Sequence, residues 1–168
     1  MSNSKYLLRF NVGFIINQPV GTFRTLSFEA ERIQFETEPV FEHFKGEVKV
    51  NRVVQGILIQ GDFQAAVPVE CVRCLEGFLQ PVHTEFDELY AFREEEADES
   101  GQLLSENGFI DLGPVVREYL LLEVPIRSHC KDDCRGLCDV CGANLNQGAC
   151  EHYPRAEGSV SRAGRIGD

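Results

Sequence analysis

The residues of this 168-residue chain that could do chemistry are its cysteines, which fall into two short stretches. Two residues separate the cysteines of each Cys-x2-Cys pair, and such a pair can face one metal ion across a tight turn. Gly142, directly after one pair, tolerates the positive φ of such a turn. Both pairs therefore predict metal-binding turns of the zinc-knuckle kind. The candidate ligands are Cys71, Cys74, Cys130, Cys134, Cys138, Cys141, Cys150 and His152.

Structural zinc sites take four nitrogen or sulfur ligands in a tetrahedron, so these eight side chains permit two ions. The simplest division assigns Cys138, Cys141, Cys150 and His152 to a local site, called the C-terminal group, because its spacing closes without outside ligands. Cys71, Cys74, Cys130 and Cys134 then form a second site, called the joining group, which connects two distant segments. Two alternatives stay open. The chain could bind a single ion and leave the other thiols free, or His129 could replace Cys134 as a ligand of the joining group.

Cysteines can also serve as buried apolar residues, as a redox dithiol or as ligands of an iron–sulfur cluster, and the sequence favours zinc over each. Buried free cysteines behave as small apolar residues, but charged residues such as Lys131 and Asp139 surround these. A redox dithiol usually begins a helix, whereas Cys71 ends an expected strand. The spacing of Cys134, Cys138 and Cys141 also fits an iron–sulfur cluster, but 27 residues after Cys141 leave no room for a barrel.

The sequence predicts no enzyme. It contains no Ser/His/Asp order, no glycine-rich phosphate loop and no convincing carboxylate pair. His43 and His83 are expected to be ordinary polar strand residues.

Charge and composition limit the other roles. The chain carries 16 Lys and Arg against 27 Asp and Glu, a net charge of −11, which disfavours coating phosphate backbones by charge alone. With 43% hydrophobic residues it can build one core. The apolar run at residues 12–16 is too short for a secretory or membrane-spanning segment, so we expect a cytoplasmic protein. Thiols stay reduced there, which favours metal binding over disulfides.

In the segments that position the first cysteine pair, apolar and polar residues alternate with a period of two from Val40 to Phe92. This pattern predicts an antiparallel meander of strands connected at residues 51–56 and 71–77. The shorter runs Tyr6–Ile16 and Thr22–Phe28 predict further strands. One face of the central strand is apolar and consists of Ile57, Ile59, Gly61, Phe63, Ala65, Val67, Val69 and Cys71.

A helix is expected after an acidic segment. Residues 93–101 are acidic and predict a solvated, mobile loop. Asp111 is a candidate N-cap, Pro114 suits the first turn and Pro125 ends the helix. The apolar stripe of this helix is Val115, Val116, Tyr119, Leu120 and Leu122.

The expected fold class is α+β, mainly an antiparallel β meander with one or two helices and a Cys-rich C-terminal zinc-binding segment. The expected parts are a β domain at 1–92, an acidic mobile loop at 93–109, a helix plus zinc segment packed on the β domain at 110–153, and a flexible tail at 154–168.

Four blocks occur in a specific order within residues 40–153: Val69-Glu-Cys-Val-Arg-Cys-Leu-Glu76, Ile110-Asp-Leu112, Glu118-Tyr-Leu-Leu-Leu-Glu-Val-Pro125 and Cys134-Arg-Gly-Leu-Cys-Asp-Val-Cys-Gly-Ala-Asn-Leu-Asn146. This order resembles the YceD family of bacterial and plastid proteins, which is associated with accumulation of large-subunit (23S) ribosomal RNA. Two departures are His152, where the family usually has Cys, and Tyr153, where it has Asp. Histidine keeps zinc chemistry available.

The resemblance implies a non-catalytic ribosome-biogenesis factor that supports 23S rRNA accumulation or processing and large-subunit assembly, with one or two Zn²⁺ ions. Its expected partners are pre-ribosomal large-subunit RNA, a ribosomal protein or both, with no DNA, membrane or small-molecule substrate. The alternative is a zinc-stabilised protein-interaction adaptor without direct rRNA contact, which the net charge favours. Direct RNA contact requires a confined basic surface, for which the candidates are Arg73, Arg127, Lys131 and Arg135. Alternatively, these side chains offset thiolate charge or pair with Asp132 and Asp133.

Overall fold

A computed structural model describes residues 6–97 and 102–153 of the chain. The expected tail at 154–168 and part of the acidic loop, residues 98–101, lie outside the described residues. The chain divides into two compact units, which are treated separately below. Unit 1 comprises Met1–Val69 and Phe78–Ile126, and unit 2 comprises Glu70–Gly77 and Arg127–Asp168.

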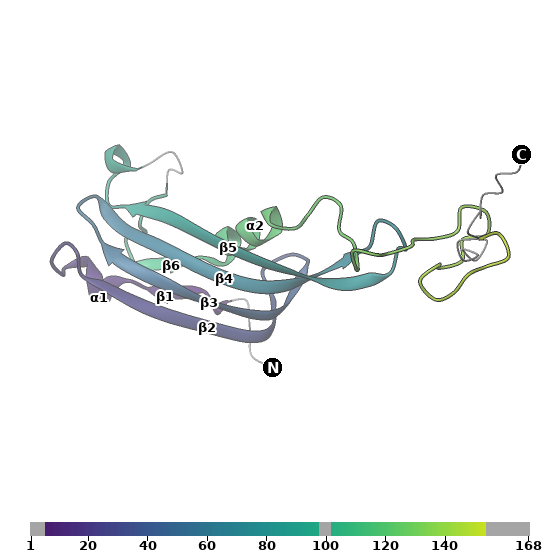
Figure 1. Cartoon of the computed structure of the whole chain (residues 1–168). Helices are drawn as coiled ribbons and strands as arrows, with labels where there is room; N and C mark the ends of the chain where they lie inside the picture. Colours follow the sequence, from purple (N-terminus) through teal and green to yellow (C-terminus); the bar gives the residue numbers. More distant parts are fainter. Residues whose placement is uncertain (1–5, 98–101, 154–168) are drawn as a thin grey trace, which may run out of the picture. The chain divides into compact units, whose positions relative to one another are not determined.

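Unit 1 is built on a four-stranded sheet, which confirms the predicted meander. Its strands are β2 (Phe23–Gln34), β3 (Val40–Arg52), β4 (Gly56–Glu70) and β5 (Gly77–Ala91). They lie in the order β2-β3-β4-β5, and the β2/β3 and β3/β4 pairs are antiparallel (Figure 1). Along β4, Ile57, Ile59 and Phe63 are buried whereas Asp62 and Gln64 are exposed, as the period of two predicts.

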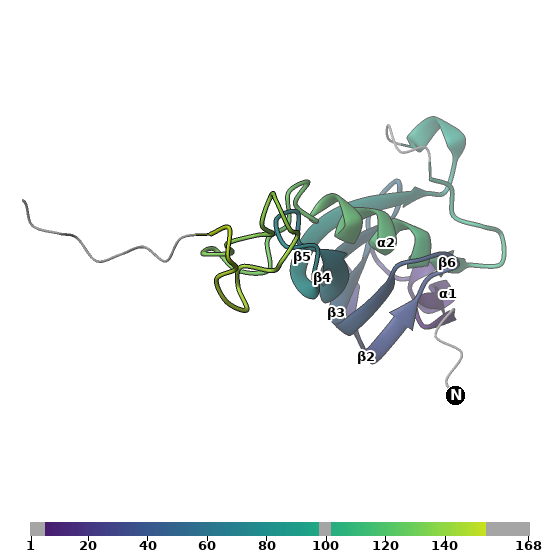
Figure 2. The ribbon, with the colours of Figure 1, turned by 90° about the vertical axis from the view of Figure 1, so that its right-hand side faces the viewer.

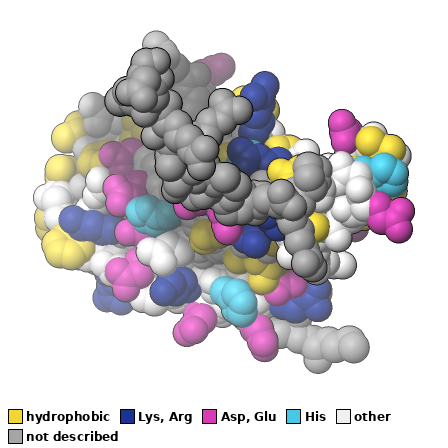
Figure 3. All heavy atoms as spheres, turned by 45° about the vertical axis from the view of Figure 1, so that its right-hand side comes forward, with side chains coloured by type: hydrophobic (Ala, Val, Ile, Leu, Met, Phe, Trp, Pro, Cys, Tyr) yellow, Lys and Arg dark blue, Asp and Glu magenta, His cyan; other side chains and the backbone are white. Residues whose placement is uncertain are grey.

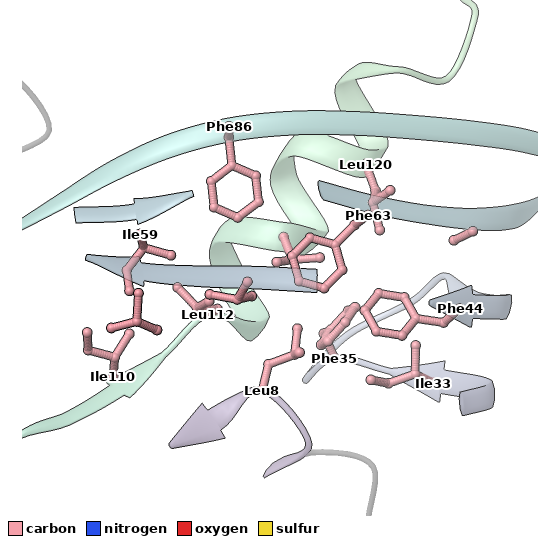
Figure 4. Packing of buried hydrophobic residues seen from close by; sticks show 14 of the residues in the cluster. Leu8, Ile33, Phe35, Phe44, Ile59, Phe63, Phe86, Ile110, Leu112 and Leu120 are labelled. Atoms are coloured by element: carbon pink, nitrogen blue, oxygen red, sulfur yellow. The ribbon is translucent and has the colours of Figure 1, made fainter. Parts of the chain in front are cut away.

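A row of aromatic rings forms the centre of the core, and strand glycines make room for it. The centroids of Phe44 and Phe63 lie 5.4 Å apart, and those of Phe63 and Phe86 lie 6.0 Å apart (Figure 4). A Cβ at Gly61 would lie 2.5 Å from Cζ of Phe86, and one at Gly46 would lie 2.2 Å from Cδ1 of Phe63. The rings therefore pack directly on the backbone, which a larger residue would prevent.

Further elements cover one face of this sheet (Figure 2). Strand β1 (Arg9–Asn11) pairs antiparallel with β6 (Phe109–Asp111), and helix α2 (Gly113–Leu122) follows. Leu8, Ile110, Leu112, Val116 and Leu120 from this layer are buried in the same core as the sheet residues. No described helix is long and apolar enough to cross a membrane.

The strand predicted over Tyr6–Ile16 is only partly correct. The strand β1 ends at Asn11, and a short helix, α1 (Gly13–Ile16), follows it. The Asn11 side chain accepts a hydrogen bond from Gly13 N at 2.7 Å, and Val12 N donates to Gly108 O at 2.8 Å. These bonds turn the chain out of the extended conformation. The second predicted run, Thr22–Phe28, forms the first part of β2.

Helix α2 follows the predicted apolar stripe except at its end. Asp111 accepts a hydrogen bond from Gly113 N at 3.0 Å, although Leu112 holds the N-cap position itself. Leu122 is 73% exposed, so its assignment to the stripe is wrong. It lies about 200° around the helix from the buried Leu120, because successive residues are separated by about 100°.

The described part of the acidic segment contains one short 3-10 helix, η2 (Glu94–Glu96). None of its residues is buried, and Glu94 and Glu95 are exposed. The chain then returns to the sheet, where Leu103 forms a β-bridge with Ala91.

Candidate metal centres

Two turns of unit 2 carry the Cys-x2-Cys pairs, and they share one pattern of backbone hydrogen bonds. In each, the first cysteine donates to the carbonyl five residues later and accepts from the amide four residues later. Both sulfur atoms of each pair lie within 4.8 Å of each other. The bonds are Cys71 N to Glu76 O (2.9 Å), Leu75 N to Cys71 O (2.9 Å), Cys138 N to Ala143 O (2.8 Å) and Gly142 N to Cys138 O (2.9 Å).

The residue after the second cysteine has a left-handed backbone in both turns. Its φ is 59° at Leu75 and 72° at Gly142. Glycine adopts this conformation freely, whereas a residue with a Cβ pays about 1–2 kcal/mol. Leu75 is 61% exposed, so little burial offsets that cost. The first turn therefore holds backbone strain that the second avoids.

The four sulfur atoms of the joining group lie together. The Sγ atoms of Cys71 and Cys134 are 3.7 Å apart, and those of Cys74 and Cys130 are 3.6 Å apart. Tetrahedral bonds of about 2.3 Å from zinc to thiolates separate the sulfurs by about 3.8 Å. Cys130 is partly exposed and the other three are buried. Because all four sulfur atoms lie within 4.8 Å of one another, this group could hold a metal ion.

Hydrogen bonds also tie the two segments that supply the joining group. Val72 N donates to Ser128 O at 3.0 Å, and Leu137 N donates to Arg73 O at 3.1 Å. The Gln147 side chain donates to Glu76 Oε1 at 2.9 Å. The turn between β4 and β5 is thus bound to residues more than fifty positions later in the chain.

The C-terminal group is more open. The ligating atoms of Cys138, Cys141, Cys150 and His152 all lie within 4.8 Å of one another. Cys138 is buried and Cys150 partly exposed, but Cys141 and His152 are exposed. The eight predicted ligands thus fall into the same two groups of four that the spacing favours, and His129 belongs to neither.

Burial, hydrogen bonds from backbone amides and neighbouring thiols together drive the pKa values of the thiols apart. Burial opposes ionisation of Cys71, but hydrogen bonds from backbone amides, including those of Cys130 and Cys74, outweigh it and lower its pKa to about 5. Burial and the neighbouring thiols raise the pKa of Cys130 to about 12. Backbone amides lower the pKa of Cys138 in the other group. A divalent cation would supply the charge that keeps all the thiols of a group ionised.

The sequence that forms these two cysteine groups matches a known protein family. Residues 59–160 match the family described as "Large ribosomal RNA subunit accumulation protein YceD". The match covers more than half of the 168 residues and includes both cysteine groups. The chain belongs to the YceD family. The resemblance drawn from the four sequence blocks is therefore confirmed.

Relatives of this YceD-family chain occur among mycobacterial proteins that are named only as uncharacterised. Those of Mycobacterium bovis and Mycobacterium tuberculosis are 33% identical over 105 residues, which cover 59% of this chain and 50% of theirs. A protein of Mycobacterium leprae is 30% identical over 105 residues, covering 59% of this chain and 48% of its own. The chain spans about half the length of these curated relatives. No solved structure matches it.

Asn146 supports the joining group, and sequence reasoning missed it. Its Nδ2 donates to Cys134 Sγ at 3.4 Å, and its Oδ1 accepts from Arg135 N at 2.9 Å. The first of these bonds is the largest influence on the Cys134 pKa, which it lowers. Side chains that donate a hydrogen bond to a ligating atom in this way orient the metal ligand. The sequence offered one signal for Asn146, because it is the last residue of the fourth family block. The spacing of the cysteines, however, predicts only metal ligands and no role for a side-chain amide.

The four basic candidates lie in unit 2 and are exposed. Nη1 of Arg73 donates to Cys134 O at 3.1 Å, and Nη1 of Arg135 lies 3.5 Å from Leu145 O. Lys131 pairs with Asp133 at 3.8 Å. Arg73 and Arg135 therefore tie loops of unit 2 together through carbonyl groups and not through the predicted carboxylates.

The two strand histidines are exposed. His83 Nε2 lies 2.9 Å from Asp62 Oδ1, a cross-strand contact between exposed side chains. His43 has a φ of 52° and lies where the pairing of β3 with β4 shifts register between Glu42 and Lys45. His43 is thus part of a β-bulge rather than an ordinary strand position.

The two turns predict opposite responses to substitution. Leu75→Gly should raise the free energy of unfolding of unit 2 by up to about 1 kcal/mol, because relief of the left-handed strain exceeds the added backbone entropy of glycine. Gly142→Ala should lower it by about 1–2 kcal/mol through strain alone, since no atom lies within 4 Å of the added Cβ. Denaturant unfolding at a fixed metal concentration measures both. Effects of the same sign would contradict this account.

Loss of one ligand should loosen both segments of the joining group. In Cys71→Ser we expect amide protection to fall at residues 69–78 and also at 126–136, because an ion bound by the joining group would hold both segments. Hydrogen exchange followed by mass spectrometry measures this. The matched control is Cys150→Ser in the C-terminal group, which should leave residues 69–78 protected. Loss confined to residues 69–78 in Cys71→Ser would show that the two segments are held separately.

Proposed function

We propose that this YceD-family chain is a non-catalytic ribosome-biogenesis factor that supports 23S rRNA accumulation or processing and large-subunit assembly. The observation that carries the proposal is the family match, whose description names large ribosomal RNA subunit accumulation and which covers most of β4 and both cysteine groups. The mycobacterial relatives add no activity, since their names state none.

In this proposal each cysteine group holds one Zn²⁺ ion. Thiolate and imidazole donors favour zinc over magnesium or calcium, which prefer oxygen. The sulfur separations of 3.6 and 3.7 Å in the joining group support a tetrahedral ion there. Bound zinc supplies folding free energy, and the residues that would hold it also orient the loops between them.

The closed ligand sets support a structural role for the metal and not a catalytic one. Catalytic zinc sites keep one position open for water or substrate, whereas four protein ligands fill a tetrahedron. Each group offers four protein ligands. We therefore propose that the protein acts by binding, without an enzymatic reaction.

The proposed partners are pre-ribosomal large-subunit RNA, a ribosomal protein or both, with no DNA, membrane or small-molecule substrate. Arg73, Arg127, Lys131 and Arg135 remain candidate contacts because their side chains are exposed on unit 2. The second candidate function is a zinc-stabilised adaptor that touches no rRNA. The net charge of −11 favours it, since most of the surface would repel phosphate.

Deletion of the protein tests the proposal. We expect less mature 23S rRNA and a delayed large-subunit peak in gradient sedimentation, both restored by the wild-type chain. Salt-sensitive association with precursor particles would support rRNA contact, because phosphate contacts weaken as salt rises. The variant Arg73→Glu with Arg135→Glu should reduce that association at normal zinc content. Arg32→Glu with Arg9→Glu, at two exposed arginines of unit 1, is the control with the same number of charge reversals. A normal 23S rRNA profile in the deletion strain would overturn the proposal.

A further inference from the structure

Part of unit 1 is free of carboxylates although the protein is strongly acidic. The chain has 27 Asp and Glu residues, yet residues 1–28 and 48–61 contain none. Strand pairing brings these two stretches together, because Phe23 pairs with Asn51 and Leu26 pairs with Val48. One end of the sheet therefore has a positive local charge within a protein that repels anions overall.

Exposed aromatic rings lie beside the basic side chains at this end of the sheet. Lys49 Nζ is 4.6 Å from the ring centroid of Phe23, and Cζ of Arg24 is 5.2 Å from that of Phe14. Phe23 is 57% exposed and Phe14 is 40% exposed. In the described parts of the chain, the ion pairs involve neither Arg24 nor Lys49. Both cations thus remain available for an anionic partner.

These four residues form a surface at the sheet edge, called the β2-edge surface: Phe14, Phe23, Arg24 and Lys49. Strand β2 is an outer strand of the four-stranded sheet (Figure 1). Phe23 and Arg24 are neighbours in β2, so their side chains point to opposite faces of the sheet. The surface therefore wraps around the free edge of β2 and offers one ring and one cation on each side.

The neighbouring residues limit this surface. Arg52 is engaged within the fold, where its Nε donates to Ile16 O at 2.9 Å and its guanidinium lies over Phe92. A shallow groove beside Lys49 is lined by Glu47, Asp62 and other carboxylates, which would repel phosphate. Acidic and basic side chains are mixed over the face drawn in Figure 3. An anionic polymer that binds this end of the sheet would therefore contact only the β2 edge.

We propose that the β2-edge surface binds single-stranded RNA, with bases stacked on Phe14 and Phe23 and phosphates on Arg24 and Lys49. Unpaired bases stack on aromatic side chains, whereas a duplex hides its base faces. The alternation of exposed rings with unpaired cations fits that chemistry better than a purely apolar partner. The inference rests on the proposed role in rRNA metabolism and names the surface and the form of RNA.

The test is binding of a labelled oligouridine, roughly twelve nucleotides long, to the full chain by fluorescence anisotropy. Phe23→Ala should weaken binding about tenfold or more. Lys49→Gln should weaken it and reduce the slope of log affinity against log salt by about 0.7. The matched control is Lys45→Gln in the same strand, which pairs with Glu29 in register and should bind as wild type.

Two further variants separate RNA from a protein partner. Phe23→Tyr keeps a stacking ring and should retain oligouridine binding, whereas Phe23→Leu keeps only apolar surface and should lose it. Wild-type protein that fails to bind oligouridine at low salt would overturn the proposal. So would Phe23→Ala and Lys49→Gln variants that bind as wild type, or retention by Phe23→Leu, which points to an apolar protein segment.

The inference and the proposed function fail in distinguishable ways. A strain carrying Phe23→Ala with Lys49→Gln should accumulate less 23S rRNA. Normal accumulation in that strain, together with a defect in the deletion strain, would reject the β2-edge surface and retain the proposed function. Normal accumulation in both strains would reject the proposed function itself.

Discussion

Unit 2 has almost no apolar interior, and this constraint governs how its residues must be held. Among its described residues the buried apolar ones are four cysteines, Cys71, Cys74, Cys134 and Cys138, and a single aliphatic residue, Leu145. Ordering each backbone residue costs about 1–2 kcal/mol, whereas burying one leucine returns only about 1.5–3 kcal/mol. In the proposed account zinc replaces the missing core, since structural zinc contributes about 10–16 kcal/mol in small peptides.

The two units therefore depend on different forces. Unit 1 is held by aromatic packing around Phe63, for which Gly46 and Gly61 leave space. In the proposed account unit 2 depends on thiols that two distant segments of the chain, residues 71–74 and 130–134, bring together. The two units also carry different proposed binding surfaces. In unit 2 the candidate contacts are cations such as Arg73, which donates to a backbone carbonyl. At the β2 edge of unit 1 they are aromatic rings beside cations, such as Phe23 beside Lys49.

Features with a local cause could be predicted from the sequence. The alternation of Ile57, Ile59 and Phe63 predicts β4, and the spacing of the cysteines predicts both the paired turns and the two groups of four. The joining group could be predicted although its two segments are distant, because four ligands per zinc ion limit how the eight side chains divide. Other features that depend on distant partners could not be predicted. The bond from Val12 N to Gly108 O ends β1, and the pairing of β2 with β3 brings Lys49 over Phe23.

The central claim is that two closed zinc sites organise unit 2. X-ray absorption at the zinc edge, on protein purified without added metal, tests it most directly. The account predicts two zinc ions per chain, with seven sulfur ligands to one nitrogen over the two sites and zinc–sulfur distances of about 2.3 Å. A ligand shell of oxygen and nitrogen atoms, or protein that holds no zinc and keeps unit 2 folded, would contradict it.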